Sequence, residues 1–545
     1  MQFRFFAFAR IGLSIGSARR ARLELLALVL ASAQSAHCAP ATALEPPQGM
    51  LHDASATPDL DASEPAFDAQ QEPAPDASVD EPEAGRMPDL PGSSDPPPNP
   101  YAAERGFATQ HGDTCASDTS PLPGPGAQQV DAKMLGLLAV CPSVLVASDD
   151  MPIAVCTQLA NQTPAIYLLD PASGSSLASR ELTKGMLFGG VYPYLDRQDF
   201  LLVVDGAQQL LRVGHRKASN ASWELFVERS FSLAPSVEAH CGSSSCDGIV
   251  GLAPDYDGRI WFATDHGLVG VVSSFADQPS VKTVSLEPGE RVLNSISTAP
   301  AGTAVLSDHA LYLFTADASG APTAAFRAPY DRGSARKPGQ LSQGSGSSPT
   351  FFGPRTGAEY LTITDNAQPL MNLLVYRSDG AGEPICTTSV PAPAGMGSEN
   401  SPIGSGRSVI IAGTYGYPYP AVPDGQAESV PTSAPLSGGM VRIDVREDES
   451  GCDVVWTNEM RSSAVPKLSR ADDLIYTIER QTVAKDGSSG LFDAYVYSVI
   501  AADTGDPVYQ QTLSGVTDTM QLAGTLGPDR TLYQGTATGI VRITP

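Results

Sequence analysis

The chain has 545 residues, with 60 acidic and 34 basic side chains, a formal net charge of −26 and a pI near 4.5. Repulsion from phosphates excludes a nucleic-acid partner and disfavours anionic membrane surfaces. Glycine (51) and proline (46) are frequent, and charged residues make up only 17 %. Such a composition is typical of many short strands joined by turns.

The first 33 residues predict an export signal. Five arginines precede a short apolar run, Leu23–Leu30, which is too short to span a bilayer as a stable helix. Cleavage is expected near Ala33. Lipidation at Cys38 is the alternative, although the motif before Cys38 lacks the aliphatic and small residues of a lipid-attachment site. We therefore expect an exported protein (periplasmic, cell-surface or secreted) with no transmembrane helix in its mature chain, attached to a membrane only if Cys38 is lipidated.

Residues 34–110 predict a disordered acidic linker. Between residues 41 and 100 there are 13 acids and one base, Arg86, among many Pro, Ala and Ser residues. Such a segment buries too little apolar surface to offset its ordering entropy, and its charges repel one another. An extended, solvated spacer is expected.

Residues 111–545 contain a repeat. The stretch Asp247–Val272 has a short strand, a polar turn, an apolar strand, an Asp-His-Gly turn and a further apolar strand. Similar units recur at roughly 45–65 residues, the spacing of four-stranded blades, and an eighth unit is expected at 130–180. The other copies lie at 191–213, 294–314, 348–376, 399–412, 463–477 and 520–543. A closed ring of blades covers every apolar face, so we predict an all-β fold, a single β-propeller of about seven or eight four-stranded blades.

Two of these repeats carry a family resemblance. Asp257–Thr264 and Gly527–Gly535 resemble repeat units of the PQQ-like (quinoprotein dehydrogenase-like) and gluconolactonase-like propellers, and Leu168–Gly174 looks like their Asp-containing hairpin. The run Pro329–Gln340 is similar to that of uncharacterised exported bacterial propellers. The resemblance implies the fold but not the function, because propellers include lactonases, lyases, dehydrogenases and binding modules.

Four of the eight cysteines suggest two disulfides. Cys141 and Cys156 flank Ser148-Asp149 symmetrically, so a hairpin turn there would place them opposite each other. Cys241 and Cys246 close a small loop. Disulfides are the usual state of cysteines in an exported protein; a redox role for the second pair is the alternative.

A candidate ligand site follows from propeller geometry. Loops leading into the innermost strands and turns between second and third strands share one face. An oxygen-rich ring there would suit calcium, whereas hairpin geometry alone also explains repeated Asp and Asn turns. The candidate ligand-binding residues from the loops are Asp247, Asn294, Glu399 and Asn400, and the candidate metal ligands are Asn294, Asp365, Asn366 and Asn400.

The segment 327–348 is the second candidate. Arg332, Arg336 and Lys337 concentrate positive charge in an acidic protein. A basic loop over the same face would clamp a carboxylate or phosphate. The alternative is a structural plug whose arginines pair with acidic neighbours.

The leading hypothesis is a non-catalytic exported binding propeller, monomeric, with a small-molecule or protein partner that stays unidentified. A calcium-assisted hydrolase or lyase acting on a small anionic or sugar-derived substrate is the alternative. Calcium is the cofactor considered; PQQ is not expected, because no adjacent cysteine pair and only three tryptophans occur. No Gly-x-Ser-x-Gly elbow stands between a strand and a helix, which disfavours a serine hydrolase.

Overall fold

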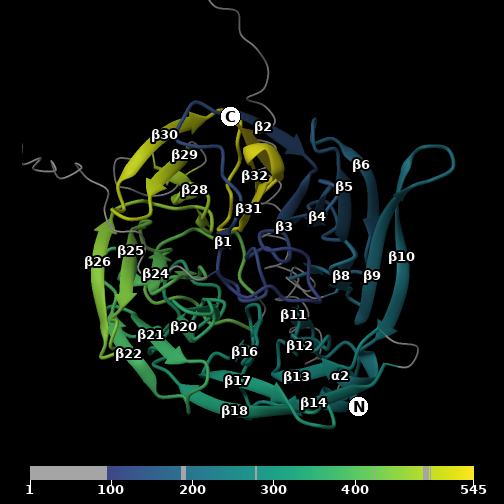
Figure 1. Cartoon of the computed structure of the whole chain (residues 1–545), viewed down its shortest axis with the longest axis horizontal. Coiled ribbons are helices and arrows are strands. Elements are labelled where there is room, and N and C mark those ends of the chain that lie inside the picture. The colour runs from purple at the N-terminus through teal and green to yellow at the C-terminus, as the bar shows by residue number, and fades with distance from the viewer. Residues whose placement is uncertain (1–94, 186–191, 276–278, 424, 483–489, 491–492) are drawn as a thin grey trace, which may run out of the picture.

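The computed structural model describes residues 95–185, 192–275, 279–423, 425–482, 490 and 493–545. In these residues eight sheets surround a central axis, as Figure 1 shows from the end of that axis. The predicted all-β propeller is confirmed, with eight blades of four strands. The expected signal peptide, the lipidation site at Cys38 and the linker up to residue 94 lie outside the described residues.

The first four blades follow chain order, each running from its innermost to its outermost strand. Their strands are β3 (Ala139–Val146), β4 (Pro152–Gln158), β5 (Pro164–Leu169) and β6 (Ser176–Glu181) in blade 1; β7 (Tyr194–Leu195), β8 (Leu201–Val204), β9 (Gln209–Lys217) and β10 (Trp223–Ser232) in blade 2; β11 (Ile249–Pro254), β12 (Ile260–Thr264), β13 (Leu268–Val272) and β14 (Val281–Ser285) in blade 3; β15 (Ser297–Ala299), β16 (Gly302–Leu306), β17 (Ala310–Ala316) and β18 (Pro322–Pro329) in blade 4.

Blades 5 to 7 repeat this order, and blade 8 takes one strand from the N-terminal side. Their strands are β19 (Thr350–Phe352), β20 (Tyr360–Thr364), β21 (Asn372–Arg377) and β22 (Pro384–Ser389) in blade 5; β23 (Ile403–Ser405), β24 (Ser408–Ala412), β25 (Met440–Val445) and β26 (Cys452–Asn458) in blade 6; β27 (Lys467–Ser469), β28 (Leu474–Gln481), β29 (Ala494–Ala501) and β30 (Pro507–Leu513) in blade 7; β31 (Gly524–Gly527), β32 (Thr531–Thr536), β33 (Gly539–Thr544) and β2 (Asp131–Gly136) in blade 8. The short helices are α2 (Ala234–Cys241), η1 (Ala394–Met396) and η2 (Pro528–Arg530).

Strand β2 closes the ring. It pairs antiparallel with β33, from Asp131 opposite Thr544 to Gly136 opposite Gly539. The outermost strand of the last blade therefore precedes the first blade in sequence. The backbone hydrogen bonds between β2 and β33 join the two ends of the ring and leave no open seam between first and last blade.

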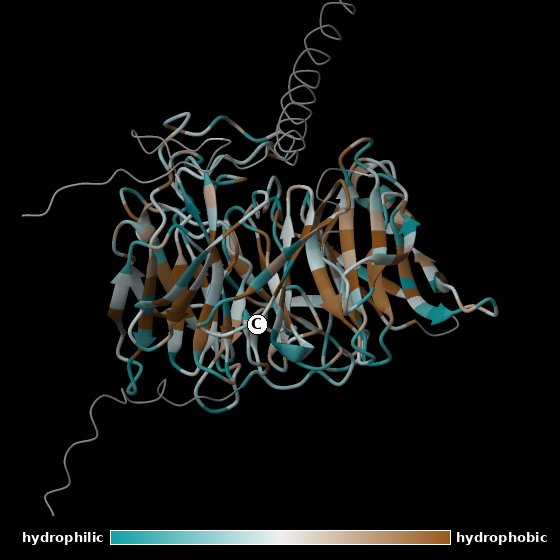
Figure 2. Ribbon diagram, turned by 90° about the horizontal axis from the view of Figure 1, so that it is seen from above, coloured by the Kyte–Doolittle hydropathy of each residue, from teal (hydrophilic) through white to brown (hydrophobic). Residues whose placement is uncertain are grey.

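The place of each strand within its blade explains which of its positions are buried and apolar. The second strands of blades 3, 5 and 6 are buried at every position, because neighbouring blades cover both of their faces. Outermost strands are more exposed, and β18 has three buried and five exposed positions. Figure 2 shows the same gradient, with hydrophobic residues concentrated on the inner strands. The core therefore lies in the seams between blades, for example the cluster of Leu306, Phe326, Leu361 and Tyr376 between blades 4 and 5.

The segment 95–130 fills the centre of the ring. Its short strand β1 (Thr119–Ser120) pairs parallel with β27. Backbone carbonyl groups along the segment accept hydrogen bonds from the innermost strands of five blades. These bonds run from Leu195 N to Ala108 O (2.9 Å), Thr298 N to Thr114 O (2.7 Å), Phe351 N to Cys115 O (2.9 Å), Gly404 N to Ser117 O (3.0 Å) and Leu468 N to Asp118 O (3.0 Å).

The segment thus supplies acceptors to strand edges that would otherwise face an open channel. The sequence analysis places residues 95–110 in the linker, whereas the structure packs them against the ring: Ala102 and Ala108 are buried, and Ala103 N donates to Leu195 O. Among the described residues, no helix is long and apolar enough to cross a membrane.

Candidate functional site

One face of the ring carries the long connections. Loops into the innermost strands and turns between second and third strands meet there, and we call it the loop face. Long connections there include 330–349 between β18 and β19, 390–402 between β22 and β23, and 413–439 between β24 and β25. These three loops connect strands of blades 4 to 6, so this part of the loop face extends beyond the ends of the strands.

Asn294 and Glu399 meet on this face through Gly346. The Asn294 Nδ2 atom donates to Gly346 O over 2.9 Å. Gly346 lies so close to Glu399 that a Cβ atom at residue 346 would stand 2.5 Å from the carboxyl carbon of Glu399. Only glycine fits this approach without displacing the acid. Two of the predicted site residues are therefore brought together by the loop 330–349.

Glu399 has an altered acidity. Its Oε1 accepts a hydrogen bond from Leu341 N over 2.7 Å. Burial raises the pKa of Glu399 from 4.5 to about 8, against the opposing effects of backbone hydrogen bonds and the charge of Arg336. The charge of Glu399 in turn contributes to raising the pKa of Tyr192 and Tyr419, both raised chiefly by burial. At neutral pH this part of the loop face therefore presents a neutral carboxyl group beside two phenols.

Asn400 points to blade 8 instead. Its Nδ2 donates to Gln521 Oε1 over 3.0 Å, and its buried Oδ1 has no hydrogen-bond partner among the described residues. Nearby, Arg480 donates to Asp518 Oδ2 over 2.6 Å, and the hydroxyl of Tyr417 donates to the other oxygen of Asp518. These bonds tie the loop 413–439 to blades 7 and 8.

Asp247 makes its contacts in blades 2 and 3. Its Oδ1 accepts from the backbone N–H of Gly248 (2.8 Å) and His266 (3.0 Å) and lies 3.0 Å from His266 Nδ1, and its backbone carbonyl accepts from Gln208. Its second oxygen is buried with no hydrogen-bond partner among the described residues. Asp247 thus fixes the loop after α2 against the turn between β12 and β13.

The three cations of the basic loop all bind oxygen atoms of the protein. Arg332 donates to the carbonyl and carboxylate of Asp308, each over 3.0 Å. Arg336 donates to Ala427 O (2.8 Å) and Gln340 O (2.6 Å). Lys337 is buried, and its Nζ donates to Ala367 O over 2.7 Å. Arg332 thus pairs with an acid, as the structural-plug alternative expects, whereas Arg336 and Lys337 bind backbone carbonyls instead of acids.

The candidate metal residues Asp365 and Asn366 act in the turn between β20 and β21. Asp365 accepts from the backbone N–H of Ala367 (3.0 Å) and Asn372 (2.6 Å) and from the Asn372 side chain (2.8 Å). Asn366 donates to two carbonyls of the loop 330–349. In the part of the chain that the structure describes, no group of three or more His, Cys, Asp or Glu residues could hold a metal ion.

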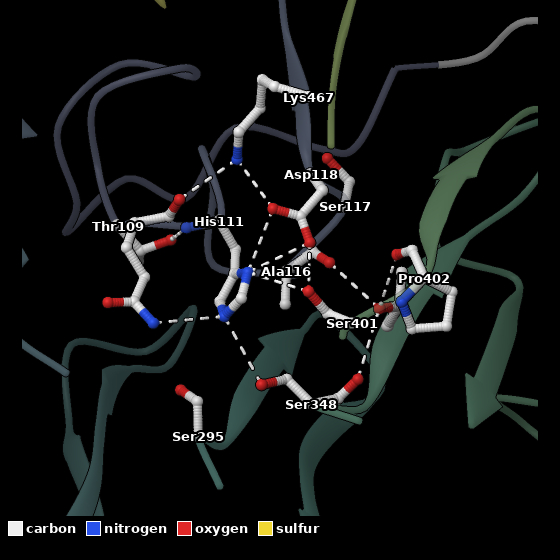
Figure 3. A network of polar contacts seen from close by, with 12 residues as sticks. Thr109, His111, Ala116, Ser117, Asp118, Ser295, Ser348, Ser401, Pro402 and Lys467 are labelled. Atoms are coloured by element: carbon white, nitrogen blue, oxygen red, sulfur yellow. Dashed lines mark hydrogen bonds and ion pairs between the residues drawn. The ribbon is translucent and has the colours of Figure 1, made fainter. Parts of the chain in front are cut away.

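A buried polar network lies in the channel, and Figure 3 shows it. Lys467 Nζ donates to Asp118 Oδ1 over 2.7 Å and to Gln110 O over 3.1 Å. The Nδ1 atom of His111 lies 3.0 and 3.1 Å from the two Asp118 oxygens, and the hydroxyl of Ser401 donates to Asp118 Oδ2. Burial opposes ionisation of Asp118, but the charges of His111 and Lys467 outweigh it and hold the pKa of Asp118 below its usual range.

This arrangement ties the segment 95–130 to blades 5, 6 and 7. Ser401 lies 3.1 Å from the same His111 Nδ1 that faces Asp118, so the histidine does not link this serine to the acid. Ser348 Oγ lies 3.4 Å from His111 Nε2 on the other side of the ring, so Ser348, His111 and Asp118 follow the order of a Ser-His-Asp triad, but all three are buried in the filled channel. None of these residues was predicted from the sequence. The signal was the polar run His111–Ser120, which follows the linker and contains no proline.

Both predicted disulfides are present. Cys141–Cys156 joins β3 to β4, and Cys241–Cys246 closes the loop after α2. A third bond, Cys386–Cys452, joins the outermost strands of blades 5 and 6. Cys115 is buried with a free thiol. Three disulfides indicate an oxidising, exported environment.

No family model matches the chain. An uncharacterised protein of Archaeoglobus fulgidus is 24 % identical over 403 residues, covering 65 % of this chain and 75 % of that protein.

Similar solved structures include a quinoprotein. This is the quinohemoprotein alcohol dehydrogenase of Comamonas testosteroni (10 % identity, 82 % of this chain and 80 % of that chain, TM-score 0.48). The Dos1 propeller is 10 % identical over 76 % of this chain and 94 % of that chain, with a TM-score of 0.44. A putative 6-phosphogluconolactonase from Bacteroides uniformis is 11 % identical over 68 % of this chain and 87 % of that chain, with a TM-score of 0.33.

Proposed function

We propose that the chain is an exported binding propeller that engages its partner across the loop face. The observation that carries the proposal is the filling of the central channel. The segment 95–130 is hydrogen-bonded to the innermost strands of five blades, so the centre of the ring is occupied by the protein itself. Binding is then left to the surface above it, where the loops 330–349, 390–402 and 413–439 are built up.

The cross-links between these loops support a preorganised surface. Arg336 bonds to Ala427 O, Val430 N donates to Arg336 O, and Thr414 Oγ1 donates to Gly339 O. The loops therefore brace one another, which lowers the ordering entropy that binding would otherwise cost. Because the basic side chains of the loop 330–349 already bind protein oxygens, anion capture by this loop is not part of the proposal.

A site-specific photocrosslinker tests the loop face. Val430 is 64 % exposed and lies on the loop 413–439, whereas Val508 is 48 % exposed on the outermost strand β30. We expect a photoreactive residue at position 430, introduced into the full chain in the secreting cell, to give a discrete adduct that position 508 does not give. Adducts from both positions alike, or none from position 430, would count against the proposal.

The calcium-assisted enzyme alternative is tested in parallel. The purified chain is assayed for bound calcium and for hydrolysis of a panel of lactones and esters, with and without a chelator. A binding propeller gives no chelator-sensitive turnover. Turnover that disappears on chelation and on Asn294→Ala would replace the proposal with the enzyme.

A further inference from the structure

A groove with a volume of about 560 Å³ runs along the seam between blades 4 and 5. One wall consists of β18 and the residues directly after it, and the other wall consists of β21, β22 and the turn between them. This volume falls in the usual range for sites that hold a small molecule or a few peptide residues. None of the polar candidates discussed for the loop face lines it except Asp365.

The groove has an acidic lining. Asp331, Asp365 and Glu383 line it, against a single base, Arg327, so the lining carries three negative charges and one positive charge. Arg327 is already matched, because its Nη2 donates to the buried carboxylate of Glu290 over 2.5 Å. Among the described residues no cation forms an ion pair with Asp331 or with the exposed Glu383.

Asp331 and Asp365, which lie at the end of the groove beside the loop face, repel each other. The pKa of Asp365 is raised, chiefly by burial and in part by the negative charge of Asp331. Lys337 lies outside the groove lining and donates to the Ala367 carbonyl, and its charge interacts with both Asp365 and Asp331. A cation placed in the groove would relieve this repulsion.

A second observation points to a ligand. Tyr376 lines the groove and is only 1 % exposed, yet its hydroxyl has no hydrogen-bond partner among the described residues. The Tyr376 ring stacks on Phe326 with centroids 6.2 Å apart, which fixes the position of the hydroxyl. The hydroxyl oxygen itself is not sealed from solvent, so it opens on the groove and is available to a ligand.

We propose that this groove binds the ammonium group of a lysine side chain in a basic peptide segment. An ammonium group supplies three donors and no acceptor, which matches the Tyr376 oxygen and the carboxylates of the lining. Asp331 and Glu383 lie at opposite ends of the groove, so they would meet different basic residues of the segment. The groove is longer than one side chain requires, since it extends from Asp331 beside the loop face to Glu383 in the turn between β21 and β22.

Fluorescence anisotropy with labelled, N-acetylated tetralysine tests the proposal on the purified full chain, with tetraglutamate as the negative peptide. Glu383→Gln should weaken tetralysine binding about two- to fivefold, the contribution of an exposed ion pair. Tyr376→Phe keeps the ring stacked on Phe326 and the net charge unchanged, and should weaken binding about tenfold because it removes a hydrogen bond to a charged group.

The matched control is Asp379→Asn. Asp379 is exposed in the same turn as Glu383 but does not line the groove, so this variant should bind tetralysine as the wild type does. Equal weakening by Asp379→Asn and Glu383→Gln would reduce the binding to general attraction by an acidic protein. That result, unchanged binding by Tyr376→Phe, or no binding of tetralysine would each overturn the proposal. None of these outcomes depends on crosslinking at Val430.

Discussion

Lys467 and Asp118 form an ion pair in the centre of the ring, with side chains 2 % and 0 % exposed. Replacing Lys467 by Met leaves the Asp118 carboxylate in the channel with one fewer charge partner. Breaking such a buried pair from one side costs about 3–5 kcal/mol. We therefore expect Lys467→Met to lower the free energy of unfolding in urea by an amount in that range.

Arg446→Gln is the control for this loss. Arg446 pairs with Asp453 over 2.6 Å, but both side chains are about half exposed. Exposed pairs contribute about 0–1 kcal/mol. Equal losses in the two variants would show that the channel pair is solvated and does not anchor the segment 95–130.

The raised pKa of Glu399 predicts that the stability of the fold depends on pH. Its pKa in the folded chain is about 8, against an ordinary value of 4.5. A group whose pKa rises on folding contributes stability that is complete below 4.5 and is lost as the pH rises through 8. Glu399→Gln is uncharged throughout, so its melting temperature should fall less between about pH 5 and pH 8 than that of the wild type. Identical falls in the two proteins would contradict the raised pKa.

At the scale of elements, the segment 95–130 stabilises the inner edges of the blades. A chain that begins at residue 129 retains β2 but lacks the acceptors for N–H groups of five innermost strands. Each buried donor without a partner costs about 1–3 kcal/mol, and water entering the channel would recover part of this. We expect a clear drop in the urea midpoint of this chain. A chain that begins at residue 95 should keep the wild-type midpoint; equal midpoints for all three would argue against a stabilising role.

The disulfide Cys386–Cys452 should stabilise the ring more than Cys241–Cys246. The first closes 66 residues between two blades, and the second closes 5 residues in one loop. In the chain-entropy description a loop of this larger size contributes about 4 kcal/mol. The double serine variant of Cys386 and Cys452 should thus lose more unfolding free energy than that of Cys241 and Cys246. A larger loss of unfolding free energy in the Cys241 and Cys246 variant would contradict this expectation.

The blades could be predicted from the sequence because their signals are local. Each hairpin has its own apolar strands and turn residues, and Cys141 and Cys156 face each other across one such hairpin. Strand β2 could not be placed in this way, since its partner β33 lies at the other end of the chain. The channel segment 95–130 was missed for the same reason, because its partners are the inner strands of many blades.

The candidate site was predictable only in part. The position of Asn294 and Glu399 on one face follows from propeller geometry, and the structure joins them through Gly346. The partners of Arg332, Arg336 and Lys337 depend on how loops from different blades fold over one another. Charge alone does not show whether such cations bind a ligand or the protein.

In the whole molecule, the N-terminal part of the described chain stabilises the ring in two places, at its rim and at its centre. Strand β2 completes the outermost layer of blade 8, and the segment before it fills the axis. The blades then share one continuous hydrogen-bonded assembly from centre to rim. Binding is left to surfaces, of which the loop face and the groove between blades 4 and 5 are built from different blades and can be tested separately.

Hydrogen–deuterium exchange of the segment 106–120 tests the central claim most directly. In the structure its backbone N–H groups at Gly106, Gly112, Ala116 and Asp118 are bonded within the filled channel. Peptides covering this segment should exchange about as slowly as the buried strand β16. Complete exchange within seconds, as in an unstructured linker, would contradict it and would leave the channel open as a site.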